Sequence, residues 1–379
     1  SFGDAAAELS ACGVGGPVTI NVVQGTYTEQ FAISAIPGAS STNTVVIQAA
    51  STNTLPAEVT YAATGSADNY VMQLTGTQYL TVRGLTLTPT GASNGRAIEL
   101  YGNCAHVNIE DNILNGVPST TTSTFMAVIY NGTATVDTIS NMTIRGNTIT
   151  NGSYGVYIYG TSSAYAMNNT IDSNMVTDFY YMGVYSYYQE NLKINGNTIV
   201  QNSIAANSTG YGIYNYYGDF SSVVGNIVKL YSSSTIYGIY NYFCDASSSN
   251  PNLIANNMVS CVGNSGTTYG IYPYNNYYTD IVYNSINVTA GSSTSGRGIY
   301  LNSSTSGTYG FVNLKNNNVS NIGGGYAVEV SSGAVTLGYV ASSNYNNMYA
   351  TGTTLARVNN TNYADLAAYQ LAVPTFDQN

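Results

Sequence analysis

The segment Gly212-Ile213-Tyr214-Asn215-Tyr216 recurs, unchanged, as Gly238-Ile239-Tyr240-Asn241-Tyr242. Its first three positions, a glycine, a β-branched residue and a tyrosine, occur six times at a nearly regular spacing. Such a period indicates a structural unit that is repeated because it cannot bury its apolar side without a neighbour. The sequence therefore predicts a solenoid. The six copies are Gly155-Val156-Tyr157, Gly183-Val184-Tyr185, Gly212-Ile213-Tyr214, Gly238-Ile239-Tyr240, Gly270-Ile271-Tyr272 and Gly298-Ile299-Tyr300.

A second repeat, out of phase with the first, has an asparagine followed at the second position by an aliphatic residue. Runs rich in Val, Ile, Thr and Tyr lie between the two repeats and are broken by Gly, Asn and Ser, with no helical period. The repeated unit is therefore expected to contain only β-strands. The copies begin at Asn112, Asn147, Asn174, Asn197, Asn226, Asn257, Asn284 and Asn317.

Repeated β-strands without helical crossovers favour a coil of short strands stacked on the next coil. A propeller blade usually needs about 40 or more residues and a signature of its own, which this sequence lacks. We predict an all-β fold, a single right-handed parallel β-helix of roughly ten or more coils. Residues 1–15 are predicted as an N-terminal cap with a short helix, 16–345 as the β-helix and 346–379 as a C-terminal cap or tail.

Strand alternation predicts which side chains face water. If the β-branched residue of each Gly-aliphatic-Tyr copy points inward, the tyrosine beside it and the residue two positions later point outward. Two stripes of stacked tyrosines result, and Asn215 and Asn241 between them would point inward, where they could join an asparagine ladder. The stripes contain Tyr157, Tyr159, Tyr185, Tyr187, Tyr214, Tyr216, Tyr240, Tyr242, Tyr272, Tyr274 and Tyr300.

Two interpretations of the tyrosine stripes stay open at this point. Outward tyrosines can simply stabilise a sheet, at roughly 0.2 to 1 kcal/mol for each cross-strand pair. They can also form a contact surface, because tyrosine offers a large, rigid and amphipathic area at little entropic cost. A sister subunit or a cell-surface glycan would suit such a surface.

The composition restricts the classes of partner. Charged residues make up 7% of the chain, and 18 acidic against 8 basic residues give a formal net charge of −10. A nucleic acid is excluded as a partner, because a phosphate-binding surface needs clustered Lys and Arg. No apolar run approaches the roughly 18 residues of a membrane span. The four cysteines have no metal-ligand spacing. Neighbouring coils could bring Cys244 and Cys261 together, but buried free thiols are their expected state.

The repeats Asn195-Gly196-Asn197-Thr198-Ile199 and Gly212-Ile213-Tyr214 resemble those of the pectate-lyase-like superfamily of parallel β-helices. The opening stretch, residues 16–29, resembles the first coil of secreted bacterial surface proteins of that fold, and residues 362–370 resemble the segment that ends their β-helix. The resemblance implies export to the bacterial cell surface, in many cases by a separate C-terminal sorting domain. It implies no one activity, because lyases, hydrolases, adhesins and passive stalks share this fold.

The catalytic motifs of the superfamily are not recognisable here. Its glycosidases hold three aspartates near a Gly-His-Gly, whereas the single histidine, His106, has no glycine beside it. Its lyases pair calcium-binding acids with a basic residue, whereas the acids here are scattered singly. One polar cluster stands out and is expected to be an ion-pair network, with an acid/base site as the alternative. It comprises Arg83, Arg96, Glu99, His106, Glu110 and Asp111.

We therefore expect a non-enzymatic structural or adhesive protein of the bacterial exterior, with no catalytic residue, no metal and no cofactor. Self-association into a filament or surface layer is the sharper form of this hypothesis, since the ends of a β-helix are natural docking faces. Asp137-Thr138-Ile139 resembles an O-glycosylation signal of exported bacterial proteins, which makes Thr138 a candidate glycosylation site. The alternative function is a polysaccharide-active lyase or hydrolase, or a carbohydrate-binding module.

Overall fold

The structure is a computed structural model that describes residues 1–132, 138–202, 209–232, 234–263, 266–289 and 295–379. The chain divides into two compact units, Ser1–Gln189 and Glu190–Asn379, which are described separately.

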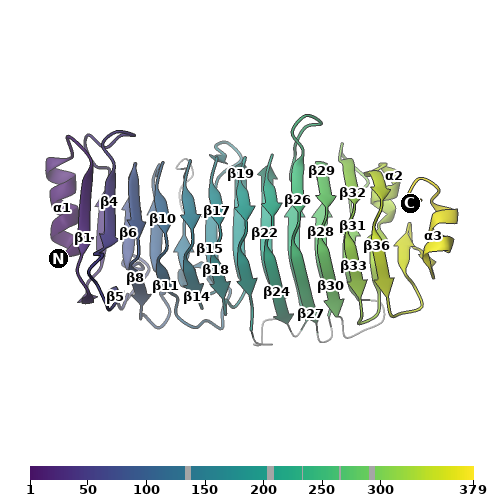
Figure 1. Cartoon of the computed structure of the whole chain (residues 1–379), viewed down its shortest axis with the longest axis horizontal. Helices are drawn as coiled ribbons and strands as arrows, with labels where there is room; N and C mark the ends of the chain where they lie inside the picture. The colour runs from purple at the N-terminus through teal and green to yellow at the C-terminus, as the bar shows by residue number, and fades with distance from the viewer. Residues whose placement is uncertain (133–137, 203–208, 233, 264–265, 290–294) are drawn as a thin grey trace. The chain divides into compact units, whose positions relative to one another are not determined.

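In the described part of the first unit the strands form three parallel sheets, A, B and C, and successive strands of the chain enter them in turn (Figure 1). Sheet A contains β1 (Val18–Val22), β4 (Val45–Ala49), β7 (Leu80–Arg83), β10 (Asn108–Glu110), β13 (Thr143–Arg145) and β17 (Thr170–Asp172). Sheet B contains β2 (Gly25–Thr28), β5 (Ala57–Tyr61), β8 (Thr86–Pro89), β11 (Ile113–Asn115), β14 (Thr148–Thr150) and β18 (Met175–Thr177). Sheet C contains β3 (Phe31–Ser34), β6 (Met72–Thr75), β9 (Ile98–Tyr101), β12 (Ile129–Tyr130), β15 (Tyr154–Tyr159) and β19 (Met182–Glu190), with β16 (Ala166–Met167) beside β19.

The second unit repeats this arrangement in the same order. Its sheet A contains β20 (Lys193–Asn195), β23 (Ser222–Val224), β26 (Asn252–Ala255), β29 (Tyr277–Val282), β32 (Gly310–Lys315) and β35 (Val340–Asn344). Its sheet B contains β21 (Thr198–Val200), β24 (Ile227–Ser232), β27 (Met258–Gly263), β30 (Ser285–Thr289), β33 (Asn318–Asn321) and β36 (Asn347–Ala350). Its sheet C contains β22 (Thr209–Asp219), β25 (Thr235–Tyr242), β28 (Thr268–Tyr274), β31 (Gly296–Leu301), β34 (Tyr326–Val330) and β37 (Ala356–Val358), followed by the antiparallel β38 (Thr361–Tyr363).

Three sheets that take one strand each from every coil define a parallel β-helix, and the two units together contain about 11 turns. The core of each unit is a stack of inward-facing side chains, mostly aliphatic, that come from most of the strands. In the second unit Ile213, Ile239, Ile271 and Ile299 stack in sheet C with no exposed surface. The predicted fold class is thus confirmed, and within each unit the Gly-aliphatic-Tyr copies lie in register in sheet C.

The asparagine repeat forms a buried hydrogen-bonded ladder at the turn that leads into sheet B. In the second unit the Asn226 side-chain oxygen accepts from both the backbone and the side-chain nitrogen of Asn197, at 2.9 and 3.0 Å. The same pattern joins Asn226 to Asn257, Asn257 to Asn284, Asn284 to Asn317 and Asn317 to Asn346. The Asn257 amide also donates to the Val223 carbonyl of the preceding coil. Each of these buried amides is therefore satisfied by the neighbouring coils.

A shorter ladder of the same kind joins Asn112, Asn147 and Asn174 in the first unit. The hypothesis that Asn215 and Asn241 join an asparagine ladder is wrong. Both side chains are buried and in register, but Asn215 donates to Ser221 Oγ, and the next position in this column is Pro273, which offers no amide.

Helix α1 (Phe2–Cys12) covers the first coil, as the sequence predicted for a cap. Ser1 and Asp4 form a capping box at its start, and Gly13 ends it with a φ of 64°. The Phe2 ring stacks on Phe31 of β3 at 4.7 Å, and Glu29 accepts from the backbone nitrogens of Phe2 and Gly3. These contacts close the apolar interior of the unit at this end.

The predicted boundary at residue 345 falls between β35 and β36, and parallel pairing continues as far as Val358. Two short helices, α2 (Ser332–Thr336) and α3 (Leu366–Ala372), belong to this part of the chain. Among the described residues, no helix has both the length and the apolar character that crossing a membrane requires.

Asp377 occupies the position of the next ladder asparagine. It follows Asn346 at about the distance of one coil along the chain, and its carboxylate accepts from the Asn346 backbone and side-chain nitrogens at 3.3 and 2.8 Å. Ser343 Oγ also donates to this carboxylate at 2.5 Å. Phe376 pairs with Ser343 as a parallel β-bridge, so the segment enters sheet A as the start of another coil would. Asp377 thus terminates the ladder.

Replacing Asp377 by alanine should leave the last ladder donors without an acceptor in a buried site. We expect the free energy of unfolding of the Asp377→Ala variant to fall by about 1 to 3 kcal/mol, measured by denaturant unfolding. The matched control is Asp377→Asn, which keeps one acceptor oxygen and should lose clearly less. An equal loss in both variants would contradict the assignment of Asp377 as an acceptor for the ladder.

Candidate functional site

The glycines of the repeat lie where successive coils come close together. A Cβ atom on Gly212 would lie 2.6 Å from the Gly238 carbonyl oxygen, and it would also collide with Val228 of sheet B. Gly238 and Gly270 face the carbonyl of the following glycine in the same way. A side chain is therefore excluded at this column. The glycine allows sheet C to approach sheet B closely, and it fixes the outward position of the tyrosine two residues later.

Three columns of tyrosine cover the outside of sheet C in the second unit. We call them together the tyrosine face. The central column consists of the tyrosine of each Gly-aliphatic-Tyr copy. The second column lies two residues later in each strand, and the third consists of the tyrosine directly before the repeat glycine. Neighbours within each column are paired in register across β22, β25 and β28. The tyrosine face consists of Tyr214, Tyr240, Tyr272 and Tyr300; Tyr216, Tyr242 and Tyr274; and Tyr211, Tyr237 and Tyr269.

Most rings in the central and third columns lie nearly parallel to one another. Tyr214 and Tyr240 are 4.8 Å apart between ring centroids at 19°, and Tyr240 and Tyr272 have the same separation and angle. Tyr211 and Tyr237 are 4.6 Å apart at 4°. Rings in adjacent columns are as close, for example 4.9 Å between Tyr237 and Tyr240. The tyrosines are half-buried by each other rather than fully exposed, and Tyr272, which we expected to point into water, is buried with 8% of its surface exposed.

The first unit carries a smaller group of the predicted tyrosines. Tyr157 pairs with Tyr185 at 4.8 Å and Tyr159 with Tyr187 at 4.7 Å, at angles of 37° and 40°. Tyr130 extends the first of these columns by one coil. The structure thus brings the predicted contact residues together in two groups, one in each unit. Their role in binding stays a prediction.

An ion pair ends the tyrosine column in each unit. In the first unit, Glu99 stands in register with Tyr130, and Arg96 lies 2.5 Å from Glu99 and 3.5 Å from the centroid of the Tyr130 ring. In the second unit, Glu329 follows Tyr300 in register and is bound by both Arg297 and Arg357. Buried carboxylates therefore occur at these ends, and in each case arginine neutralises them.

The predicted polar cluster is divided between two sheets. Arg96 and Glu99 lie with sheet C, whereas Arg83 and Glu110 lie on sheet A, in register with each other. Glu110 also lies opposite Arg145, which forms an ion pair with Asp172 at 3.2 Å. The result is a row of alternating charges across successive coils of sheet A, in which Arg145 and Asp172 form an ion pair and Arg83 donates to Gln48. The cluster is not one site.

His106 and Asp111 are turn residues with positive φ angles of 54° and 53°. The His106 ring stacks on Tyr79 at 4.6 Å and 8°. Thr138 is half-exposed, and its backbone nitrogen donates to Asn103. Asp137, which belongs to the predicted glycosylation signal, lies outside the described residues. Cys104, Cys244 and Cys261 are buried thiols.

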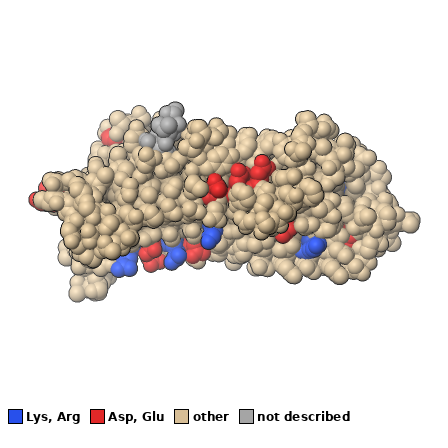
Figure 2. All heavy atoms as spheres, turned by 90° about the horizontal axis from the view of Figure 1, so that it is seen from above, with Lys and Arg blue, Asp and Glu red and all other residues tan. Residues whose placement is uncertain are grey.

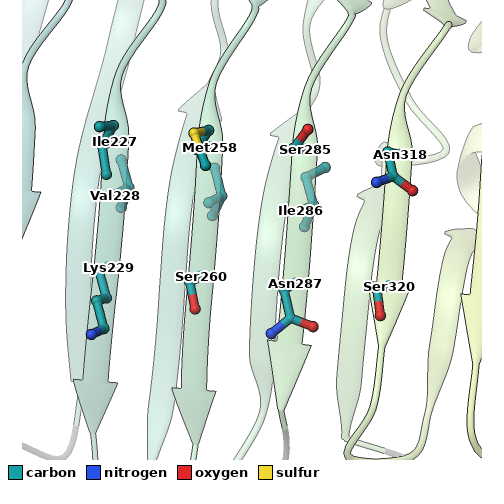
Figure 3. Close-up of a pocket in the computed structure, with 11 residues that line it drawn as sticks. Ile227, Val228, Lys229, Met258, Ser260, Ser285, Ile286, Asn287, Asn318 and Ser320 are labelled. Carbon is teal, nitrogen blue, oxygen red and sulfur yellow. The ribbon is translucent and has the colours of Figure 1, made fainter.

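A shallow groove of about 290 Å³ lies on sheet B of the second unit. Figure 3 shows its two outward rows, in which Ile227, Met258, Ser285 and Asn318 stand beside Lys229, Ser260, Asn287 and Ser320. The aliphatic residues behind them form its floor. Lys229 is the one ionisable residue among the described residues that line the groove, so the groove lacks an acid and base pair. In the part of the chain that the structure describes, no three His, Cys, Asp or Glu side chains are grouped so that they could hold a metal ion.

Sequence reasoning missed the third tyrosine column. Strict alternation would turn Tyr211 inward, but two consecutive residues, Gly212 and Ile213, are buried between Tyr211 and Tyr214. The strand therefore changes phase at the glycine, and both tyrosines point outward. The signal was present as the dipeptide Tyr-Gly at the start of three copies of the repeat in the second unit.

The sequence matches the model of a protein family described as a right handed beta helix region over residues 70–259, which is half of the chain. The chain belongs to this right-handed β-helix family. Family membership supplies the handedness that the sheet order alone does not state. A comparison with curated protein sequences finds no match.

Several solved structures are similar to this right-handed β-helix protein at low sequence identity. The Dettilon tailspike protein is 14% identical with a TM-score of 0.55, and the match covers 90% of this chain. This chain spans 62% of the tailspike chain, less than two thirds of its length. A mannuronic acid specific lyase of polysaccharide family 6 from human gut microbiota is 12% identical, with a TM-score of 0.47 and coverage of 92% of this chain and 84% of its own. PfbA, a surface adhesin of Streptococcus pneumoniae, is 12% identical, with a TM-score of 0.44 and coverage of 94% and 84%.

The tyrosine face should resist ionisation at alkaline pH. Burial, followed by the neighbouring tyrosines, raises the pKa of Tyr214 and Tyr240 in the face and of Tyr157 in the first unit, and burial raises the pKa of Tyr300 to about 12. Unfolded tyrosines ionise near a pKa of about 10. Above that pH the unfolded chain loses protons that the folded chain keeps, so the free energy of unfolding should fall as pH rises.

This fall can be measured by denaturant unfolding at neutral pH and at about pH 11, together with phenolate absorbance. We expect many of the 37 tyrosines to ionise only when the chain unfolds. Ionisation of all of them near pH 10 in a chain that stays folded would contradict the burial of the face.

Proposed function

We propose that this chain is a non-enzymatic structural or adhesive protein of the cell exterior, and that the tyrosine face is its contact surface. The observation that carries the proposal is the continuous array of tyrosine rings on one side of sheet C. Tyrosine provides rigid, amphipathic contact area that loses little conformational entropy on binding. A large aromatic patch on a protein surface usually has a partner.

The distribution of charge supports contact with an uncharged surface. The sequence has 18 acidic and 8 basic side chains, and most of the face that Figure 2 presents is uncharged, with the charged side chains gathered in a few places, one of them a row in which basic and acidic side chains alternate. Several basic residues are already paired with carboxylates, as in the Arg96 and Glu99 pair and the Arg145 and Asp172 pair. Such a surface offers little repulsion to a close neutral neighbour.

The non-enzymatic part of the proposal is supported by the state of the candidate acids. Glu99 accepts from Arg96 through one oxygen and from Gln73 through the other, at 2.5 and 2.7 Å. Glu329 is bound by two arginines. A general acid or base needs an oxygen free to reach the substrate, and these two carboxylates are engaged. Location at the cell exterior rests on the resemblance of residues 16–29 to secreted surface proteins.

Replacing tyrosines at the centre of the face should weaken binding or association. We expect Tyr214→Ser with Tyr240→Ser to reduce glycan binding on arrays, or self-association measured by light scattering, by about tenfold or more. The matched control is Tyr283→Ser with Tyr349→Ser, because these tyrosines are 60% and 56% exposed and lie outside the face. Circular dichroism must show that both variants are folded. Equal behaviour of the two double variants would contradict the proposal.

Incubation with acidic and neutral polysaccharides should release neither new reducing ends nor unsaturated products. The physical reason is that the candidate acids are engaged by arginine or separated between sheets. Turnover can be followed by reducing-sugar assay and by absorbance of unsaturated products. Turnover that disappears in Glu99→Gln or Asp111→Asn, but not in Tyr283→Ser, would assign the chain to the alternative, a polysaccharide-active enzyme.

A further inference from the structure

We propose that the tyrosine face binds a neutral, hydroxyl-rich polysaccharide through the hydroxyls and edges of its rings, and not through ring faces. This inference rests on the proposed function and specifies the partner of the same surface. It differs from the usual aromatic recognition of sugars, in which a sugar ring stacks on an open aromatic face.

The ring faces inside the array are already occupied by other rings. Tyr240 stacks on Tyr214 and on Tyr272, each at 4.8 Å and 19°, so both of its faces have an aromatic neighbour. Tyr237 lies in the same position between Tyr211 and Tyr269, at 4.6 and 4.9 Å. Offset parallel stacking of this kind is favourable by about 0.5 to 1.5 kcal/mol per pair. A sugar ring would have to break these contacts to reach a face.

Ring edges and phenol hydroxyls are therefore the part of the array that a ligand can reach. Tyr272 is buried and is not itself available to a ligand, but its hydroxyl shows the chemistry of the array, because it accepts a hydrogen bond from Asn302 Nδ2 at 2.8 Å. A phenol hydroxyl can both donate and accept, as a sugar hydroxyl can. Burial raises the pKa of Tyr214, Tyr240 and Tyr272, so these phenols keep their donor hydrogen at neutral pH and above.

The charge around the array selects a neutral ligand over an acidic one. Arg297 and Arg357, the cations at the end of the columns, are both bound to Glu329. Lys229 lies on sheet B, beside the groove and not on the tyrosine face. An acidic polymer would therefore place its carboxylates against desolvated phenols, and no unpaired arginine among the described residues lies beside them. The net charge of −10 on the chain also repels an acidic polymer.

The spacing of the array suits a polymer more than a single sugar. Ring centroids repeat every 4.6 to 4.9 Å along the columns through β22, β25 and β28. Adjacent columns are 4.8 to 5.6 Å apart at most positions. A regular grid of weak donors and acceptors gains affinity when many equivalent groups of one chain bind at once. A polysaccharide presents hydroxyls in such a regular row.

Replacing tyrosine by phenylalanine separates hydroxyls from ring stacking. The test compares Tyr214→Phe with Tyr240→Phe against Tyr214→Ser with Tyr240→Ser and the native chain. Phenylalanine keeps the stack and removes the hydroxyl, whereas serine removes the ring. The control is Tyr283→Phe with Tyr349→Phe, at exposed positions outside the face. Binding isotherms are measured by depletion on insoluble cellulose, chitin and mannan, and on polygalacturonate and alginate gels.

We expect the native chain to bind at least one neutral polymer, and the Phe variant at positions 214 and 240 to lose about tenfold or more in affinity, as the Ser variant does. Binding kept by the Phe variant and lost by the Ser variant would overturn the inference while leaving the tyrosine face as the contact surface. Equal or stronger binding to the acidic polymers would overturn it as well. So would self-association that is lost in the Ser variant without any binding to polysaccharide.

If the Ser variant binds and associates like the native chain, the proposed function itself fails. The folding of every variant is checked by circular dichroism and by the unfolding midpoint. Because the Phe variant keeps the aromatic packing, a loss of binding by a folded Phe variant cannot be attributed to a damaged sheet.

Discussion

The hydrogen bonds between successive asparagines are the constraint on which the rest of the structure depends. Each ladder asparagine, such as Asn226, must receive two hydrogen bonds from the coil before and give two to the coil after, all inside an apolar interior. An amide that slipped by one position would be buried without partners, at a cost of about 1 to 3 kcal/mol. The ladder therefore fixes the register of every coil that it joins.

A fixed register has a direct effect at the opposite side of the coil. When the turn into sheet B repeats in phase, the glycine, isoleucine and tyrosine of sheet C repeat in phase too, and Tyr214, Tyr240 and Tyr272 fall into line. The loops between the sheets vary in length, which accounts for the uneven spacing between copies of the repeat. The asparagine amides at the turn into sheet B thus position the tyrosine rings on sheet C.

The sequence was sufficient for the fold because its periodicity records contacts that repeat in every coil. The inward isoleucines, the in-register tyrosines and the capping helix at Phe2–Cys12 all followed from patterns of residue type. What could not be predicted were features that depend on local departures from the pattern. Tyr211 points outward because the strand changes phase at Gly212, and the burial of Tyr272 depends on neighbours from three strands.

Proximity in sequence was also a poor guide to proximity across a coil. Arg83 and Arg96 are close in sequence and lie on different sides of the coil, whereas Arg83 and Glu110, a full period apart, are direct neighbours in sheet A. In a solenoid, residues separated by one full repeat in sequence lie next to each other in adjacent coils. Residues separated by half a repeat lie on different sides of the coil. Periodicity cannot show whether the tyrosine face binds a partner, because outward tyrosines are favoured both by packing within the sheet and by binding.

The ladder also has a direction, and Asp377 shows what that direction implies. At each step the backbone and side-chain nitrogens of one ladder asparagine donate to the side-chain oxygen of the next, and the acceptor for Asn346 is the carboxylate of Asp377. An ionised carboxylate has no hydrogen of its own to hand to a further coil. Asp377 has an oxygen where a ladder asparagine has its amide nitrogen, so its side chain cannot donate to a further ladder residue. A coil stacked beyond Asp377 could therefore not be joined to it by a side-chain amide in the way that Asn226 is joined to Asn257.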